Sequence, residues 1–238
     1  PVTIEEGAWN GGDRLQDLLT PRQYQLSIAE SAAFGFGFEI QFLGRFQRDL
    51  YFRRPEAIRC RDAIGHYNGF SARHEDLFTG FESVAETAIL MDDTDSQIEA
   101  LNYLASRNII FDVLFERTLT PAQRAHYKLV LRAEGSKESL LEAIRERDPQ
   151  PVVRLQAPMS VIANLVRQPE RNRTILHLIN YSNSPVQDVS VLVRGRFRRA
   201  GIFTPDNIER EVRLSPAGEG YTRLAVKALD LYDVLALE

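Results

Sequence analysis

Two adjacent carboxylates near the start of the chain are its clearest candidates for acid–base chemistry. The opening residues, PVTIEEGAWNGG, read as a short strand, 2–4, that leads Glu5 and Glu6 into a loop holding the only tryptophan, Trp9. Because side chains alternate across a strand, only one of these glutamates can point into an interior. The alternative interpretation is that both are solvated acids near a chain end, where order is often lost.

A second cluster could suggest a metal site. Residues 66–76, HYNGFSARHED, gather two histidines and two acids, which are His66, His74, Glu75 and Asp76. Gly69 is expected to interrupt the helix that would align them, and no HExxH spacing is present. Unaligned ligands cannot close a coordination sphere, so we expect a surface cluster at a helix end and no metal site.

A third group of acids lies where open α/β sheets bind ligands. Residues 91–97, MDDTDSQ, follow a predicted strand and precede a predicted helix. No glycine-rich loop is present there to bring backbone N–H groups to a phosphate, so we expect no nucleotide and no other cofactor. Asp95 is explained as the N-cap of the following helix.

The remaining histidines and a run of arginines fit structural roles. His126 falls in a predicted short helix and His177 in a predicted strand. The stretch VRGRFRRAG, near a turn, holds four cations: Arg194, Arg196, Arg198 and Arg199. Charges blunt exposed sheet edges, so we interpret this run as a solvated strand edge.

Composition excludes several classes of protein. Of 238 residues, 44% are apolar and 26% charged, as in ordinary globular chains. The net charge of −4, without a separate basic block, argues against nucleic acid, and no apolar run approaches the ~18 residues that span a membrane. Cys60 is the only cysteine, which fits a reducing compartment, so we expect a cytoplasmic location. The start at Pro1 suggests a processed product, a fragment or renumbering.

The first of three stretches, 1–82, alternates strand and helix. Thr20-Pro21-Arg22-Gln23 has the form of a capping box, which predicts a helix from Pro21 that ends at Gly35. FGFEIQF, residues 36–42, alternates like a strand. A second helix is predicted after Pro55, with a break near Gly65 or Gly69.

The other two stretches differ in rhythm. Residues 83–157 alternate strands and helices, with a second capping box at Thr120 and a cap at Ser136, and PVVRLQ as the closing strand. This pattern predicts a small flavodoxin-like layer with a mostly parallel sheet. Residues 158–238 hold strands and turns alone, typical of an antiparallel β-sandwich. The predicted fold class is therefore α/β plus all-β.

Taken in order, these stretches resemble the C-terminal portion of a β-galactosidase family of glycoside hydrolases. In that family a (β/α)8 barrel is followed by a trimerisation domain of glutamine-amidotransferase-like fold and a small β domain. The similar segments are TIEEGAW, LSIAESAAFG and FGFEIQF for the last barrel elements, NIIFDVLFERTLTPAQRAHYKLVL for the trimerisation domain, and TILHLINY and LYDVLALE for the β domain.

The resemblance implies roles for the opening residues. Glu5 or Glu6 stands where the family's nucleophile ends a barrel strand, and Trp9 would be a sugar-stacking platform, with a packing role as the alternative. The amidotransferase-like layer has no cysteine and no G-x-S-x-G elbow, so glutaminase chemistry is excluded.

The chain departs from the family in what it lacks. A (β/α)8 barrel needs eight strands in about 200 residues or more, and only two are found here. Retaining glycosidases need two carboxyl groups about 5 to 5.5 Å apart, and the strand with the general acid is absent. We therefore expect the chain alone to be inactive and the missing barrel portion to belong to the same precursor or to another chain.

These points leave two hypotheses about function. The first is the C-terminal segment of a β-galactosidase-like glycoside hydrolase, serving in assembly as a homo-oligomer, with a trimer as one option, and with a carbohydrate ligand. The alternative is a non-catalytic oligomerisation or carbohydrate-binding module.

Overall fold

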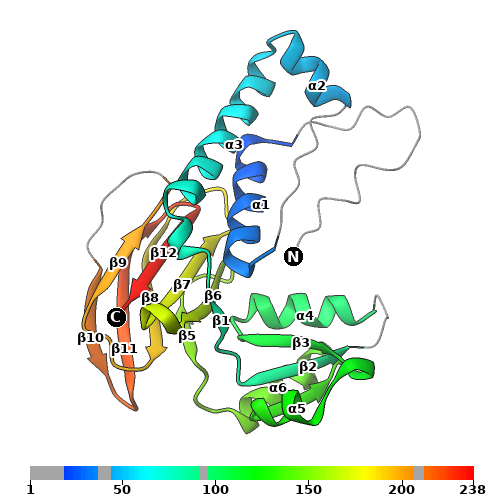
Figure 1. Cartoon of the computed structure of the whole chain (residues 1–238), viewed down its shortest axis with the longest axis vertical. Helices are drawn as coiled ribbons and strands as arrows, with labels where there is room; N and C mark the ends of the chain where they lie inside the picture. Colours follow the sequence, from blue (N-terminus) through cyan, green and yellow to red (C-terminus); the bar gives the residue numbers. More distant parts are fainter. Residues whose placement is uncertain (1–18, 37–43, 92–95, 206–211) are drawn as a thin grey trace. The chain divides into compact units, whose positions relative to one another are not determined.

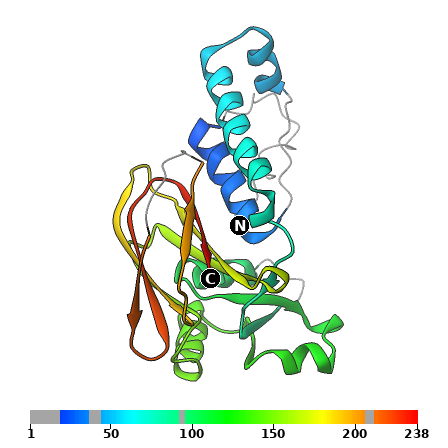
Figure 2. The ribbon, with the colours of Figure 1, turned by 60° about the vertical axis from the view of Figure 1, so that its left-hand side comes forward.

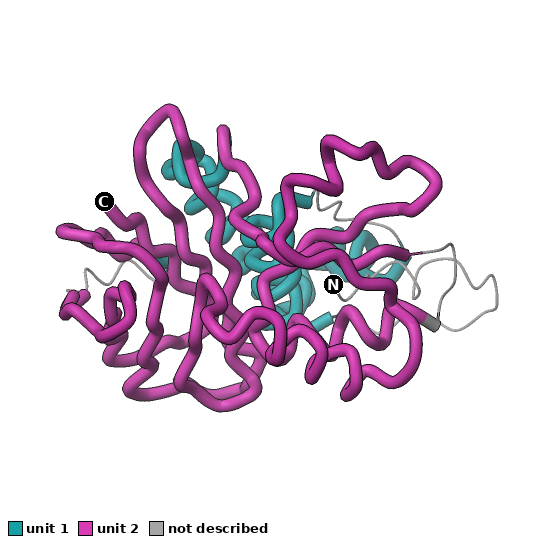
Figure 3. Tube along the Cα trace, turned by 90° about the horizontal axis from the view of Figure 1, so that it is seen from below, with its two compact units in different colours: residues 1–79, 204–208 teal, residues 80–203, 209–238 magenta. Residues whose placement is uncertain are grey.

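The structure is a computed structural model that describes residues 19–36, 44–91, 96–205 and 212–238. The chain divides into two compact units, one of residues 1–79 with 204–208 and the other of residues 80–203 with 209–238 (Figure 3). The predicted strands at 2–4 and across most of 36–42 lie outside the described residues, as does the predicted cap Asp95. In the described part, no helix is long and apolar enough to cross a membrane.

The first unit is helical in its described part. It contains α1 (Pro21–Phe34), α2 (Gly44–Tyr51), α3 (Pro55–Arg73) and the short 3-10 helix η2 (Glu75–Leu77). The α1 and α3 helices lie side by side (Figures 1 and 2). The buried apolar side chains of the pair are Tyr24, Ile28, Ala29, Ala33, Ala57, Cys60, Ile64, Tyr67 and Phe70. These residues recur at helical spacing, so each helix buries one face.

Both ends of α1 are those that the sequence predicts. The Thr20 hydroxyl accepts a hydrogen bond from the Gln23 backbone N–H, and the Gln23 side chain accepts one from the Thr20 N–H, which completes the capping box. Gly35 caps the other end with φ of 71°, a left-handed conformation that glycine adopts without a Cβ clash.

The predicted break in α3 is wrong, because the helix continues through Gly65 and Gly69 to Arg73. Both glycines take helical angles, and a glycine inside a helix costs only about 1 kcal/mol relative to alanine. Ile64, Tyr67 and Phe70 are buried on either side of these glycines, and burial of one such side chain contributes about 1.5–3 kcal/mol. Packing therefore outweighs the local preference.

The second unit contains a small parallel α/β layer. Strands β2 (Thr87–Met91), β3 (Phe111–Phe115) and β4 (Leu129–Arg132) form a sheet in the order β3-β2-β4, and both pairings are parallel. Helices α4 (Ser96–Ser106) and α6 (Lys137–Arg147) enclose an apolar cluster with the sheet that includes Ile89, Leu104, Leu141 and Ile144. The first four residues of β2 are buried, as expected for a central parallel strand.

The links in this layer follow the predicted caps. The capping box at Thr120 opens α5 (Pro121–His126), and the Ser136 hydroxyl accepts a hydrogen bond from the Ser139 N–H at the start of α6. The 3-10 helix η3 (Glu116–Thr118) follows β3 directly.

The rest of the second unit is a two-sheet sandwich in which every strand pairing is antiparallel. One sheet has the order β1-β6-β7-β12-β9 and the other β10-β11-β8-β5. The bounds are β1 Glu82–Ser83, β5 Val153–Gln156, β6 Val161–Gln168, β7 Arg173–Asn180, β8 Val186–Arg194, β9 Ala200–Phe203, β10 Arg213–Ala217, β11 Tyr221–Leu229 and β12 Tyr232–Leu237, with the 3-10 helix η4 at Pro169–Arg171.

The strand in PVVRLQ corrects the sequence-based sheet assignment. It forms β5 and pairs with β8 of the sandwich, where we expected it to close the parallel sheet. Val153 and Leu155 point to the sandwich core while Arg154 alternates with them, a pattern of one covered face. The α/β plus all-β fold class is confirmed, and the division into domains 1–82, 83–157 and 158–238 stays a prediction.

The continuous α3 helix predicts opposite effects for two glycine substitutions in the first unit. A Cβ at Gly65 would meet no atom within 4 Å, so Gly65→Ala should stabilise this unit by about 0.5–1 kcal/mol in urea unfolding. Gly35→Ala should destabilise it by about 1 kcal/mol, because the cap needs a positive φ. A loss of stability in Gly65→Ala would contradict an uninterrupted α3.

Candidate functional site

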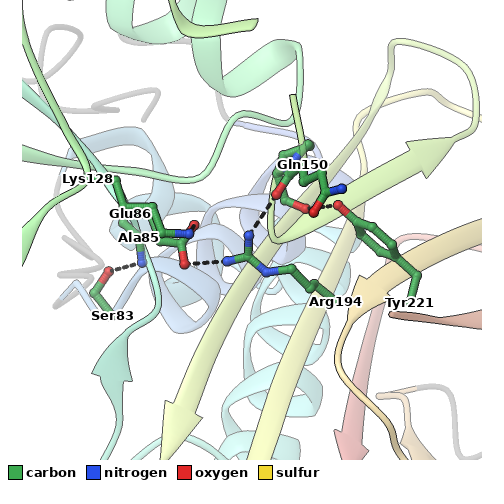
Figure 4. A network of polar contacts seen from close by, with 8 residues as sticks. Ser83, Ala85, Glu86, Lys128, Gln150, Arg194 and Tyr221 are labelled. Atoms are coloured by element: carbon green, nitrogen blue, oxygen red, sulfur yellow. Dashed lines mark hydrogen bonds and ion pairs between the residues drawn. The ribbon is translucent and has the colours of Figure 1, made fainter. Parts of the chain in front are cut away.

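The sequence-predicted catalytic and sugar-binding residues Glu5, Glu6 and Trp9 lie outside the described residues. A network of charged and polar contacts in the second unit lies where the α/β layer joins the sandwich (Figure 4). We call it the seam cluster, and it consists of Glu86, Lys128, Gln150, Arg194 and Tyr221.

The carboxylate of Glu86 is the centre of the seam cluster. Glu86 lies just before β2, and its Oε2 accepts a hydrogen bond of 2.6 Å from the Nζ of Lys128, just before β4. Its Oε1 forms an ion pair with the guanidinium of Arg194, the last residue of β8. Two cations from different elements therefore share one carboxylate (Figure 4).

The same arginine also contacts the chain that returns to the sandwich. Nη1 of Arg194 donates a 2.7 Å hydrogen bond to the backbone carbonyl of Gln150 (Figure 4). The Tyr221 hydroxyl donates one of 2.6 Å to the carbonyl of Pro151. The segment between α6 and β5 is thus fixed to β8 and β11 by side chains.

The charges of this cluster suppress its acid chemistry. Burial raises the pKa of Glu86, but hydrogen bonds from Arg194 and Lys128 outweigh it and hold that pKa below its ordinary value. The hydrogen bond to Glu86 raises the pKa of Arg194 above its ordinary value. Glu86 is therefore a carboxylate at neutral pH and is unsuited to act as a general acid.

The interpretation of the arginines in VRGRFRRAG as a solvated strand edge holds for three of the four. Arg196, Arg198 and Arg199 are exposed, as predicted. Arg194 is only 26% exposed in its side chain and carries the ion pair with Glu86. Sequence reasoning missed this ion pair because Glu86 lies next to the parallel sheet, whereas Arg194 belongs to a sheet of the sandwich. The one local signal was the charge of Glu86 directly before the buried strand β2.

A cavity of about 440 Å³ adjoins the seam cluster. Its lining comes from the ends of α4 and α6, the residues just before β2 and β3, and β5, and its polar members are Glu86, Thr87, Arg107, Asn108, Arg145, Asp148 and Arg154. Asn108 joins the cavity to the sandwich, because its side-chain oxygen accepts a 2.7 Å hydrogen bond from the Ala163 N–H of β6. The guanidinium of Arg154 lies 4.7 Å from the centre of the Tyr221 ring.

The position of this cavity limits what it can do. It lies at the amino ends of β2 and β3, whereas open α/β sheets bind ligands at the carboxyl ends of their strands. Helices α4 and α6 end here, and the partial negative charge of a helix C-terminus attracts cations such as Arg107 and Arg145. Its groups can hydrogen-bond a polar ligand, but with Glu86 bound to two cations they do not form an acid–base pair.

The histidine and acid cluster at 66–76 does not assemble into a metal site. His66 lies within α3, the His74 ring lies 5.0 Å from that of Phe70 at the helix end, and Glu75 and Asp76 belong to η2. Across the described ranges, no group of three histidine, cysteine or acidic side chains is placed to hold a metal ion. The residues of MDDTDSQ at 92–95 lie outside the described ranges.

The other nucleophiles and histidines are in structural positions. Nδ1 of His177 in β7 lies 2.8 Å from the Tyr232 hydroxyl of β12, and burial lowers the pKa of His177 to about 3. His126 is exposed at the end of α5. The Cys60 thiol donates a hydrogen bond to the Leu19 carbonyl, and burial raises its pKa, which makes it a poor nucleophile.

The lowered pKa of Glu86 predicts how the stability of the second unit depends on pH. The folded value is below the ordinary value of 4.5, so its contribution is fully present above pH 4.5 and is lost as the pH falls through the folded pKa. Glu86→Gln should therefore lower the free energy of unfolding by about 1–3 kcal/mol at pH 7, with a difference from wild type that shrinks as the pH falls through the folded pKa of Glu86.

A matched control comes from an exposed ion pair. Glu99, whose side chain is 76% exposed, pairs with Lys137, so Glu99→Gln should change the free energy of unfolding much less than Glu86→Gln does. Equal effects of the two substitutions in denaturant unfolding would show that the seam cluster is no more than a surface ion pair.

The buried His177 gives a spectroscopic prediction. Because its pKa is about 3 in the folded chain, its ring should stay neutral from pH 8 to pH 5. Two-dimensional NMR of the ring nitrogens checks this, and a midpoint for His177 near 6.5 would contradict the buried pairing with Tyr232.

No protein-family model matches the chain, and no curated protein is significantly similar to it in sequence. Among solved structures, the chain is similar to α-L-fucosidase isoenzyme 2 from Paenibacillus thiaminolyticus, with a TM-score of 0.66 and 14% identity over 95% of this chain and 58% of the fucosidase chain. A GH42 β-galactosidase from G. stearothermophilus gives a TM-score of 0.47 and 11% identity, over 94% of this chain and 51% of the galactosidase chain. A rhamnosidase from Novosphingobium sp. PP1Y gives a TM-score of 0.37 and 14% identity, over 71% of this chain and 19% of the rhamnosidase chain. The last two scores are too low to support a shared fold. The chain thus has a glycoside hydrolase-like fold and spans little more than half the length of that fucosidase chain.

Proposed function

We propose that the chain is the C-terminal part of a β-galactosidase-like glycoside hydrolase and that its own contribution is assembly. The observation that carries this proposal is the fold: 95% of the chain aligns with an α-L-fucosidase, yet it covers only 58% of that enzyme. The uncovered part leaves room for the barrel strands that the sequence lacks. A cytoplasmic location belongs to the proposal, since Cys60 is the only cysteine.

The proposed chemistry needs residues from two sources. Glu5 or Glu6 would be the nucleophile, Trp9 would stack on the sugar, and the general acid would come from the missing barrel portion. The described residues support this division, because the carboxylate of the seam cluster, Glu86, is held ionised by Lys128 and Arg194.

The proposed assembly role depends on a rigid second unit. The seam cluster ties the α/β layer to the sandwich through both segments that connect them. A layer held in this way can present a surface to another subunit without the loss of conformational freedom that weakens association. We therefore propose a homo-oligomer built through residues 83–157, with a trimer as one option.

A carbohydrate-binding module is the second candidate, and the cavity beside the seam cluster favours it. Its volume of about 440 Å³ is within the range of small-molecule sites, and it combines apolar walls with hydrogen-bonding groups. Binding of a sugar to the chain alone, lost in Arg154→Ala, would support this candidate.

The catalytic part of the proposal is tested in the whole protein, with the barrel portion present. One of Glu5→Gln and Glu6→Gln should lower kcat for an aryl β-galactoside by about 10³-fold or more, and the other should leave it nearly unchanged, because only one side chain faces the interior. The chain of 238 residues alone should release no aryl alcohol. If neither substitution affects kcat in folded protein, the assignment of the nucleophile is wrong.

A further inference from the structure

Strand β3 is an edge with an apolar surface. In the order β3-β2-β4 it borders the sheet, and among the described residues no strand pairs with its outer side. Val113 and Phe115 are 40% and 42% exposed, whereas the first four residues of the neighbouring β2 are buried. Parallel sheets are normally covered, and an exposed apolar edge strand is a template for pairing with another chain.

The usual protection of such an edge is lacking on β3. Its one charged residue is Asp112, and charges on an edge strand normally oppose pairing. The Asp112 carboxylate is taken up within its own chain, because the Ser83 and Tyr127 hydroxyls each donate a hydrogen bond of 2.8 Å to it. The acid therefore opposes only those strand registers that place it opposite another acid.

The exposed side chains share one face with the helices. Phe111 packs into the cluster beneath α4 and α6, and side chains alternate along a strand, so Val113 and Phe115 point to that same face. Ile98, near the start of α4, is also 46% exposed. An additional strand beside β3 would be in a position to cover Val113 and Phe115.

We infer that this strand is β3 of a second copy, joined antiparallel about a two-fold axis at Val113. The inference rests on the proposed role in assembly and names its contact surface. A two-fold axis perpendicular to the sheet keeps the helices of both copies on one face of the joined sheet. Residues that face each other across two paired strands point to the same face, so the axis must pass beside a residue that faces its own equivalent in the second copy. We call this residue the centre of the pairing, and the possible centres are Asp112, Val113 and Leu114.

Charge selects among these centres. A centre at Asp112 places two aspartates opposite each other, and one at Leu114 places Asp112 opposite Glu116 of the second copy. Like charges directly opposite each other destabilise a strand pair. A centre at Val113 pairs Val113 with itself, Phe111 with Phe115, and Asp112 with Leu114, so the apolar side chains meet and no like charges face each other.

Cysteine crosslinking of the whole chain tests this register. In Val113→Cys the two cysteines face each other, with Cβ atoms about 4.5–5.5 Å apart, so mild oxidation should give a disulfide-linked dimer on a non-reducing gel. Phe115→Cys is the matched control on the same strand, face and level of exposure. Its two cysteines would lie roughly 14 Å apart and should not crosslink. The wild-type chain, with buried Cys60 alone, should stay uncrosslinked.

A second measurement separates the register from the assembly itself. By sedimentation, Val113→Lys should raise the dissociation constant of the wild-type dimer by about tenfold or more, because two like charges then face each other. Glu142→Lys, on the exposed side of α6, should not. Equal crosslinking of both cysteine variants, or a wild-type chain that is monomeric, would overturn the inference. A trimer without the Val113→Cys crosslink would overturn it while leaving the assembly proposal intact.

Discussion

The second unit depends on one partly buried carboxylate that is neutralised by two cations from different parts of the fold. The chain starts the sandwich with β1, leaves it to build the α/β layer, and returns with β5. Glu86 lies on the outgoing segment and Gln150 on the returning one, and Arg194 contacts both. The layer is therefore an insertion whose two connections are fixed to one strand of the sandwich. Removing one partner leaves a partly buried charge, which costs more than the pair itself contributes.

Under the proposed function, stability and chemistry lie in different parts of the protein. Two acids of the second unit are bound by neighbouring groups: Glu86 by the cations Lys128 and Arg194, and Asp112 by the hydroxyls of Ser83 and Tyr127. A glycosidase needs one carboxyl group that keeps its proton and another that is free to attack, and groups bound in this way meet neither need. The similarity to an α-L-fucosidase at 14% identity concerns the fold alone, because folds are reused more widely than sites.

Sequence reasoning succeeded where the cause is local. The capping boxes at Thr20 and Thr120 and the end of α1 at Gly35 depend on residues within one turn, so spacing and residue type suffice. It failed where distant packing decides. Gly69 does not break α3, because the buried residues around it outweigh one glycine, and β5 joins β8, a partner that follows it by some 30 residues. The pairing of Glu86 with Arg194 likewise required knowing that two sheets meet there.

The strand order of the larger sheet sets when the sandwich can form during synthesis. Strand β12 lies between β7 and β9, and all six of its residues are buried, yet it comes last in sequence order among the described strands of the sandwich. Until β12 has left the ribosome, β7 and β9 each have an unpaired edge where β12 will pair, and the core lacks the side chains of this central strand. The larger sheet can therefore be completed only after Leu237 has been translated. Nascent chains that stall before that point would present aggregation-prone edges, so holding chaperones should engage this region during synthesis.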